Sequence, residues 1–323
     1  MSLRKLAAIV AACAALAVSA TPGYSQQWPA RSVKVVVPYG AGGVTDTMAR
    51  LTADRLTRTL GQSFVVENKV GAGGAIGIDY AMNQPRDGYT ILFVGSTLFT
   101  VLPLAQKVNY EPLKDLIPVS ITGTNGMVMV VPNDSPFKTL KEFVEHARKN
   151  PGKMTYSSGG PATNNHLATA YFAGREKLDM VHVPYRGGQP ALAAVMSKSV
   201  DMLFGNSSDL IEPAKAGTVR AIAVSTPKRM PQLPDVPAAA EIYPGYDYIA
   251  WNGYAVTGGV PEEVRKRLAE VLLPISRDPQ IVDTFNKLGI DALGTTPEEA
   301  LATIRKDIPI YSQIVDIAGV RLK

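Results

Sequence analysis

Short apolar runs rich in β-branched and aromatic residues recur along the chain, and turn-forming residues separate them. Most of these runs are nearly continuous rather than alternating, which is typical of strands buried on both faces. The pattern predicts strands at residues 32–39, 63–68, 90–96, 127–132, 153–158, 179–185, 201–206 and 219–225, with one later candidate at 252–259.

Between these runs, apolar residues recur at helical spacing. One helix is predicted over residues 44–60, where Gly61 ends the run. Its apolar stripe consists of Ala49, Ala53, Leu56 and Leu60. Further helices are predicted at 138–149, 261–275 and 297–318, and the last two begin with proline followed by two glutamates.

Alternating strands and helices at this spacing predict parallel βαβ units and therefore an α/β fold. The alternation occurs twice, and a helix-rich tail follows it. We expect a two-lobed fold of the periplasmic-binding-protein type, in which each lobe is a mainly parallel sheet flanked by helices. The first lobe is assigned to residues 27–126 plus 247–323 and the second to 127–246, with a hinged cleft between them that closes on a ligand.

The N-terminal segment has the pattern of a secretory signal peptide. A short basic stretch precedes an apolar run over residues 6–18, and small polar residues follow. The run is too short to span a bilayer and lacks an amphipathic face for docking as a buried helix. We assign the signal peptide to residues 1–26, cleaved between 20 and 26, with Ala20 favoured. Lipidation at Cys13 is disfavoured because too few apolar residues precede it.

Export would change the composition. Cys13 is the only cysteine, so the mature chain would have no disulfide or thiol chemistry. Loss of Arg4 and Lys5 lowers the formal net charge by two, from +5 to +3. With no basic stripe, this charge predicts no nucleic-acid partner. The sequence has no second long apolar run, which predicts a soluble periplasmic protein with no membrane span.

One strand-to-helix corner occurs twice, as "VPYGAGG" at 37–43 and "VPYRGG" at 183–188. We expect the two corners at equivalent places in the two lobes, at the carboxyl ends of strands, where α/β sheets bind ligands. Glycines at 40, 42 and 43 allow close approach of a ligand, and the following helix offers unpaired N–H groups. Together they predict an anion site that needs no basic side chain. A simple tight turn is the alternative, and the repeat favours binding.

Several segments in fixed order give a resemblance to a known family. They are "WPARSVKVVVPYGAGGVTDTMAR", "VVENKVGAGGAIG", "PRDGYTILFVGS", "HVPYRGGQPAL", "VRAIAVSTPKRMPQLPDVP" and "TPEEALATIRKDI". Over essentially the whole mature chain, the sequence resembles the solute-binding proteins of tripartite tricarboxylate transporters, the Bug-type periplasmic receptors. The resemblance implies a receptor that closes on a small carboxylate, passes it to membrane permease subunits and performs no chemistry. We expect it to act as a monomer, with no cofactor and no metal.

The resemblance also implies the ligand-binding residues. They belong to the loop after the first strand, the "GST" loop and three stretches of the second lobe: Tyr39, Ala41, Gly42, Gly43, Thr45, Asp46, Ser96, Thr97, Ser157, Ser158, Thr163, Asn164, His166, Tyr185 and Asn206. The chain departs from the family pattern at two places. It has Phe204-Gly205-Asn206 where the family commonly has Phe-Asp-Asn, and its "GPATNN" loop differs from the commoner Gly-x-Gly-Ser. Both departures lie where the variable end of a ligand is expected, so no substrate is carried over.

Three of these features also have plainer interpretations. Asp46 lies in the first turn of a helix, where an acid often only complements the dipole. His166 is more readily structural than catalytic, since no metal-ligand spacing links it to the other histidines, His146 and His182. "GAGGAIG" at 71–77 fails the dinucleotide fingerprint, because Ile76 stands where glycine is required.

Two other function classes have weaker support in the sequence. Ser-x-x-Lys occurs at Ser135–Lys138 and Ser225–Lys228, but the partner motifs of penicillin-binding enzymes are absent, so an exported hydrolase is disfavoured. A binding module of a sensory system stays open.

The ligand class depends on an aromatic segment, "YPGYDYIAWNGY" at 243–254. It holds five of the chain's 23 aromatic residues. Packing at the hinge is the favoured interpretation; an apolar wall beside the cleft, suited to an aromatic acid such as terephthalate or a long dicarboxylate, is the alternative. An amino acid ligand is disfavoured, because its ammonium would need a dedicated acidic partner.

Overall fold

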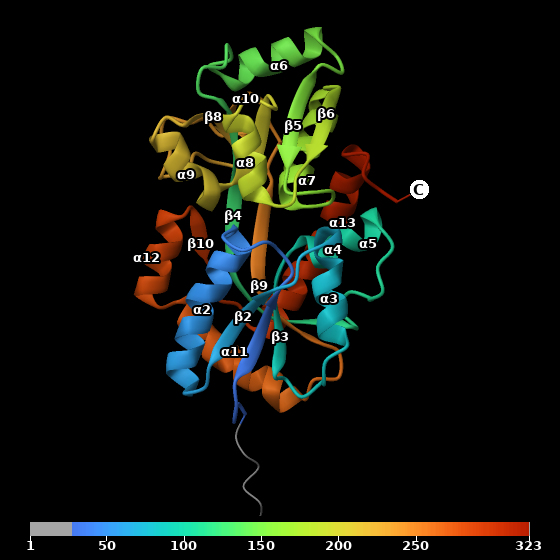
Figure 1. Cartoon of the computed structure of the whole chain (residues 1–323), viewed down its shortest axis with the longest axis vertical. Helices are drawn as coiled ribbons and strands as arrows, with labels where there is room; N and C mark the ends of the chain where they lie inside the picture. The colour runs from blue at the N-terminus through green and yellow to red at the C-terminus, as the bar shows by residue number, and fades with distance from the viewer. Residues whose placement is uncertain (1–27, 323) are drawn as a thin grey trace, which may run out of the picture. The chain divides into compact units, whose positions relative to one another are not determined.

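Two β-sheets joined by one long strand organise the chain (Figure 1). The structure is a computed structural model and describes residues 28–322. Its strands are β1 (Val33–Val37), β2 (Phe64–Asn68), β3 (Thr90–Gly95), β4 (Leu116–Pro132), β5 (Met154–Ser158), β6 (Met180–Pro184), β7 (Met202–Asn206), β8 (Val219–Val224), β9 (Ile249–Thr257) and β10 (Ile290–Ala292).

The first sheet contains β1 between β2 and β3, followed by β9, β4 and β10. The second contains β5 between β6 and β7, followed by β4 and β8. Strand β4 belongs to both: up to Gly126 it pairs with β9, and from Met127 it pairs with β7. The strand order β2-β1-β3-β9-β4-β7-β5-β6 runs through both sheets.

The two-lobed α/β class predicted from sequence is confirmed, but both sheets are mixed rather than mainly parallel. Strands joined by helices, β1 to β3 and β5 to β7, pair in parallel. Strands β4 and β9 pair antiparallel with each other and with neighbours in the sheets they cross. The difference arises because β4 passes directly from one sheet to the other and β9 pairs beside it, without a crossover helix.

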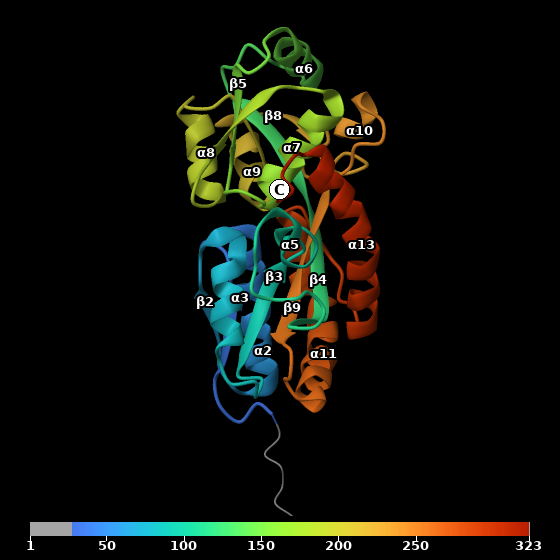
Figure 2. The same cartoon turned by 90° about the vertical axis from the view of Figure 1, so that its right-hand side faces the viewer.

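Helices cover both sheets. They are α2 (Val44–Leu60), α3 (Ala75–Met82), α4 (Thr97–Thr100), α5 (Leu102–Ala105), α6 (Leu140–Lys149), α7 (Asn164–Glu176), α8 (Gly188–Met196), α9 (Ser207–Lys215), α10 (Ala239–Ile242), α11 (Glu262–Ser276), α12 (Pro279–Lys287) and α13 (Pro297–Ile317), with a short 3-10 turn, η1, at Ala72–Gly74. Figure 2 shows α13 passing the first sheet and reaching α7 at its C-terminal end.

Helix α2 shows how the predicted pattern becomes packing. Ala49, Ala53 and Leu56 are buried as predicted, whereas Leu60 is only half-buried. Gly61 ends the helix in the left-handed conformation, with φ of 69°, and its N–H bonds to the Thr57 carbonyl. Beneath it, the β1 side chains of Val35 and Val36 are fully buried, as expected for a strand covered on both faces.

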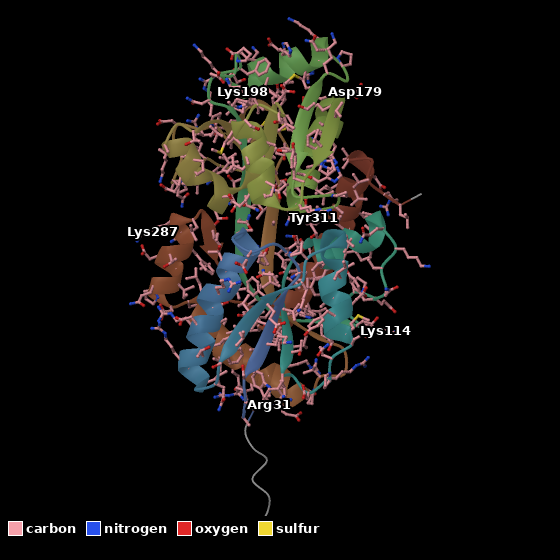
Figure 3. The ribbon with its side chains drawn as sticks, viewed as in Figure 1. Arg31, Lys114, Asp179, Lys198, Lys287 and Tyr311 are labelled. Carbon is pink, nitrogen blue, oxygen red and sulfur yellow. The ribbon has the colours of Figure 1, made fainter. Side chains whose placement is uncertain are left out.

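The segment expected to be a signal peptide, with Cys13, lies outside the described residues. Residues 31–322 belong to one compact unit. Within it, charged side chains such as Lys114, Asp179, Lys198 and Lys287 lie at the periphery, whereas Tyr311 lies between the regions that carry the two sheets (Figure 3). None of the helices described in residues 28–322 has the length and apolar character needed to cross a bilayer.

Candidate ligand-binding site

A cavity of about 670 Å³ lies where the carboxyl ends of both sets of parallel strands meet. Its walls are the loops that follow β1, β2 and β3 in the first sheet and β5, β6 and β7 in the second. The lining residues are Pro38–Ala41, Gly43–Thr45, Val70–Gly74, Thr97, Gln106, Gly159–Pro161, Thr163–Asn165, Tyr185–Pro190, Asn206 and Asp209. Six strand-to-helix corners therefore surround one cavity.

The two "VPY" corners both line this cavity, but the prediction that they occupy equivalent places is wrong. The first follows β1, the middle of three parallel strands, whereas the second follows β6, an outer strand. By position, the counterpart of the β1 corner is the β5 corner at 159–163, and the counterpart of the β6 corner is the β2 corner at 69–74. Both sheets contain a βαβαβ unit, but the similar corners follow different strands of it. The first corner follows the first strand of its unit, β1, and the second follows the second strand of its unit, β6.

Five helices begin at this cavity, and none of the five has a side-chain cap. The N-caps of α2, α3, α7, α8 and α9 all line it; they are Gly43, Gly74, Thr163, Gly187 and Asn206. By contrast, the N-caps of α6, α12 and α13 carry side-chain hydrogen bonds and lie outside the lining. The cavity thus receives several helix N-termini, whose free N–H groups and dipoles attract an anion.

Charged side chains are scarce in the lining. Among the lining residues, Arg186 and Asp209 are the charged ones, and nine of the 28 are glycines. Backbone amides therefore make up much of the polar wall. His, Cys, Asp and Glu side chains of the described residues form no cluster of three suited to a metal ion.

Asp46 holds the first corner in place but does not line the cavity. Its carboxylate accepts hydrogen bonds of 2.9 Å from the Gly42 N–H, from Arg50 Nε and from Asn68 Nδ2. Burial opposes its ionisation, but these bonds outweigh burial and lower its pKa. Asn68 Nδ2 also donates to the Tyr39 carbonyl at 2.9 Å. The geometry favours a bracing role for Asp46 over ligand contact.

The predicted site residues of the first sheet divide into two groups. Tyr39, Ala41, Gly43, Thr45 and Thr97 line the cavity, and the Tyr39 and Thr97 hydroxyls lie 3.2 Å apart. Burial raises the pKa of Tyr39 to about 12, so its phenol stays protonated. Ser96 and Asp46 are buried behind the lining. Gly42 is exposed and lies outside the lining, but it shapes the corner through its φ of 80°.

In the second sheet, Thr163, Asn164, Tyr185 and Asn206 line the cavity, whereas Ser157, Ser158 and His166 lie behind it. Thr163 Oγ1 donates to the Gly160 carbonyl at 2.7 Å, and Asn164 Oδ1 accepts from Tyr248 Oη at 2.8 Å. Ser157 Oγ donates to the Ala191 carbonyl at 3.0 Å. These bonds fix the backbone of the corners that face the cavity.

A stacked histidine pair supports the β5 corner from inside. The rings of His166 and His182 are 4.0 Å apart and 8° from parallel. Burial lowers the pKa of His166 to about 3, helped by His182, and that of His182 to about 4. His166 Nδ1 accepts the Ala162 N–H at 3.1 Å. Ser158 Oγ lies 2.7 Å from His182 Nε2, but Ser158 is fully buried, so the contact is structural rather than a nucleophile facing the cavity.

A chain of side-chain hydrogen bonds joins the two walls. Thr45 Oγ1 donates to Asn252 Oδ1 at 2.7 Å, and Asn252 Nδ2 donates to Asn125 Oδ1 at 3.1 Å. Asn125 Nδ2 then donates to Asn206 Oδ1 at 3.4 Å, and Asn206 Nδ2 donates to Asp209 Oδ2 at 3.3 Å. The chain runs through β4 and β9 and ends on the Asp209 carboxylate.

The aromatic segment packs inside the protein instead of forming a cavity wall. Tyr246, Tyr248, Trp251 and Tyr254 are buried, and the cavity lining contains no residue of 243–254. Tyr246 Oη donates to the Ala168 carbonyl at 2.9 Å, and its ring stacks on Phe204. The hinge-packing interpretation therefore fits the structure, and the apolar-wall interpretation does not.

Several lining residues were missed by sequence reasoning. The β2 corner was set aside because it fails the dinucleotide fingerprint, yet Gly71–Gly74 line the cavity. Its position directly after a predicted strand, as in the "VPY" corners, was the available signal. Asn165, Gln106 and Asp209 also line the cavity. Asp209 lies three residues after the "FGN" stretch, and nothing in the sequence showed which way it faces.

Comparisons with known proteins agree with this geometry. Residues 48–317 match the family model described as "Tripartite tricarboxylate transporter family receptor". A UPF0065 protein encoded in the tcbD-tcbE intergenic region of Pseudomonas sp. is 35% identical over 290 residues, covering 89% of this chain and 86% of that protein. Each of these likenesses extends over most of the chain.

Two solved structures are similar over nearly the whole described chain. An R. palustris protein solved with adipate has a TM-score of 0.88 and 28% identity, covering 91% of this chain and 99% of that one. The periplasmic binding protein BugD has a TM-score of 0.86 and 31% identity, covering 92% and 100%. With the family match and the cavity at the strand ends, these likenesses place the chain in the tripartite tricarboxylate transporter receptor family, among the Bug-type solute-binding proteins.

Proposed function

We propose that this chain captures a small carboxylate, either a dicarboxylate or an aromatic acid, in the cavity between the two sheets. It then delivers the ligand to the membrane permease of a tripartite tricarboxylate transporter. The proposal includes export to the periplasm after removal of residues 1–26, action as a monomer and no catalysis. The lobes are residues 27–126 plus 247–323 and residues 127–246.

The observation that carries the proposal is the convergence of five helix N-termini without side-chain caps on one cavity. A carboxylate accepts hydrogen bonds from such N–H groups without a basic side chain. The first-sheet wall suits this role best, because Asp46 and Asn68 already fix its main corner. Such preorganisation lowers the ordering cost of binding.

The size of the cavity fits a small solute. Its volume of about 670 Å³ lies within the usual range for small-molecule sites. The likeness to the R. palustris protein solved with adipate gives a dicarboxylate as the first candidate. Aromatic acids remain candidates because the lining contains two aromatic side chains, Tyr39 and Tyr185, against which an aromatic ring could pack.

A ligand screen tests the proposal. Purified residues 27–323 are heated with C4–C6 dicarboxylates, citrate, benzoate and the phthalate isomers including terephthalate, and the affinities of stabilising compounds are measured by calorimetry. A ligand at one hundred times its dissociation constant stabilises the folded state by about 2.7 kcal/mol. We expect saturable stabilisation by at least one carboxylate, which stays chemically unchanged. If no carboxylate binds, or if the bound one is turned over, the proposal fails.

The transport step is tested in cells. Uptake of the identified ligand should depend on both this protein and the permease subunits. Uptake that persists without the permease, combined with a ligand-dependent transcriptional response, would instead indicate a sensory module.

A further inference from the structure

We infer that the ligand carries a cationic nitrogen in addition to its carboxylate, and that the Asp209 carboxylate binds this nitrogen. The inference rests on the proposed function and narrows its ligand class to amino-substituted carboxylates. The corresponding role of Asp209 is to select the ligand, while the glycine corners of the first sheet hold the ligand's carboxylate.

Asp209 is the acidic side chain of the lining, and no cation of the described residues pairs with it. Its carboxylate accepts two long hydrogen bonds from neutral groups, Asn206 Nδ2 at 3.3 Å and Ser208 Oγ at 3.4 Å. Asp46, the acid next to the first corner, is the contrast. It is paired with Arg50 and also bonded to a backbone N–H. The Asp209 carboxylate in the cavity therefore lacks a cationic side-chain partner, whereas Asp46 has one in Arg50.

Asp209 lies in the first turn of α9, where an acid complements the helix dipole, but it does not form a capping box. Asp209 is the third residue of α9, a position where an acid can bond back to the N-cap backbone N–H. Glu142 and Glu299 do this in α6 and α13. Asp209 instead contacts the Asn206 side chain, and α9 has no side-chain cap.

The carboxylate also lies beside the start of α8. A Cβ built on Gly188, the first residue of α8, would be 3.2 Å from Asp209 Oδ2. The protein's own anion thus lies beside two helix N-termini of the second sheet, α8 and α9. A ligand carboxylate would be repelled there, and a cation would be attracted. The first-sheet corners contribute no acidic lining residue, so the two walls suit opposite charges.

Burial supports this reading. Desolvation raises the pKa of Asp209 to about 6, against the smaller opposing effect of its hydrogen bonds from Asn206 and Ser208. Asp209 is half-buried, and a carboxylate partly withdrawn from water without a counter-ion is unfavourable, so an ammonium group of the ligand would supply the missing charge. Arg186, the exposed cation of the lining, remains available for a second carboxylate of the same ligand.

Matched ligand pairs test the inference. The two members of each pair differ only by an amino or aminomethyl group. The pairs are succinate and aspartate, glutarate and glutamate, adipate and 2-aminoadipate, and benzoate and 4-(aminomethyl)benzoate. Calorimetry at pH 7.5 gives the affinity ratio within each pair. We expect the aminated member of at least one pair to bind at least tenfold more tightly than its partner.

Asp209→Asn keeps the size of the side chain and removes its charge. We expect this variant to lose most of the preference for the aminated member. Glu212→Gln on the same helix, an exposed residue paired with Lys215, should keep the wild-type ratio. Because the wild-type ratio is informative by itself, the test does not depend on Asp209→Asn folding.

The outcomes separate this inference from the function on which it rests. If wild-type protein binds unaminated carboxylates as tightly as aminated ones, or more tightly, the inference is wrong and the proposed function stands. The same holds if the preference survives in Asp209→Asn. If neither member of any pair binds, and the wider carboxylate screen is also negative, the proposed function itself fails.

Discussion

The carboxamides of Asn252 and Asn125 meet where β9 and β4 run side by side, with Asn252 Nδ2 donating to Asn125 Oδ1 at 3.1 Å. Both residues are buried, and β4, which pairs with β9 here, continues into the second of the two sheets that flank the cavity. Thr45 and Asn206, one on each wall, extend this contact into the cavity lining. The structure therefore links the two ligand-facing walls through buried polar groups at the strands between them.

Replacing Asn252 by alanine should destabilise the protein. The change leaves the buried Thr45 hydroxyl and the side-chain oxygen of Asn125, Oδ1, without their partners, and each unpaired buried group costs about 1–3 kcal/mol. We expect the free energy of unfolding in urea to fall by about 2 kcal/mol or more. Asn133→Ala, at an exposed turn, is the control. A loss of stability no larger than that of the control would show that the hydrogen bonds of Asn252 contribute nothing to stability.

Ligand binding should close the cleft. The sheets are connected near 125–127 and 246–252, so rotation about these segments changes the distance between the walls. Small-angle scattering should give a smaller radius of gyration with saturating ligand than without it. An unchanged radius at saturation would contradict hinge closure.

Tyr248→Phe should weaken binding although Tyr248 does not line the cavity. Its hydroxyl donates to Asn164 Oδ1 at 2.8 Å, and Asn164 is a lining residue. We expect a three- to tenfold loss of affinity, about 0.7–1.4 kcal/mol. Tyr246→Phe removes a comparable bond, to the Ala168 carbonyl behind the lining, and should leave affinity unchanged. Equal effects of the two variants would show that Asn164 needs no such support.

Acid should destabilise the protein through its stacked histidines. The pKa values of His166 and His182, about 3 and 4, lie below the unfolded value of about 6.5. Below pH 6.5 the unfolded state binds protons that the folded state excludes, so stability falls from there towards pH 4. Asp209, whose pKa is raised to about 6, acts in the opposite direction between pH 6 and 4, but it is one group against two.

Urea unfolding between pH 7.5 and 4.5 checks this dependence. His166→Gln should flatten the profile, and His146→Gln, at an exposed position of α6, should leave it as in the wild type. An equal slope in all three proteins would rule out the histidine pair as the cause.

Much of the fold could be predicted from hydrophobic periodicity. Residues 44–60 form α2 as predicted, and the strands of the parallel sets lie within one or two residues of their predicted bounds. The first half of β4, Leu116–Gly126, was missed because its run is interrupted by Pro118, Gly123 and Gly126. Its partner β9 supplies the pairing, and such long-range pairing has no local signal.

The parts of the candidate site that the backbone forms could be predicted from sequence. The parts that depend on the orientation of side chains were harder to predict. Glycine corners are visible in sequence, because the turn itself requires glycine, as at Gly42. The orientation of Asp209 depends on the packing of α9 against β4, β7 and β8. Asp46 is kept out of the lining by its hydrogen bonds to Gly42, Arg50 and Asn68. Asp209, the acidic residue of the lining, was therefore not among the site residues that the sequence predicted.

In the proposed binding mode, backbone amides of the glycine corners, rather than a basic side chain, hold the ligand's carboxylate. Calorimetry of the best carboxylate from the screen against Gly42→Val and Arg186→Ala tests it, with circular dichroism as the folding control. Gly42 has a φ of 80°, which disfavours a β-branched residue, while no atom lies within 4 Å of an added Cβ, so the corner should distort without unfolding the protein. We predict that Arg186→Ala weakens binding by less than tenfold, under about 1.4 kcal/mol, and that Gly42→Val weakens it about a hundredfold or more. Loss of binding in Arg186→Ala with binding retained in Gly42→Val would contradict the claim and assign the carboxylate to a side-chain ion pair.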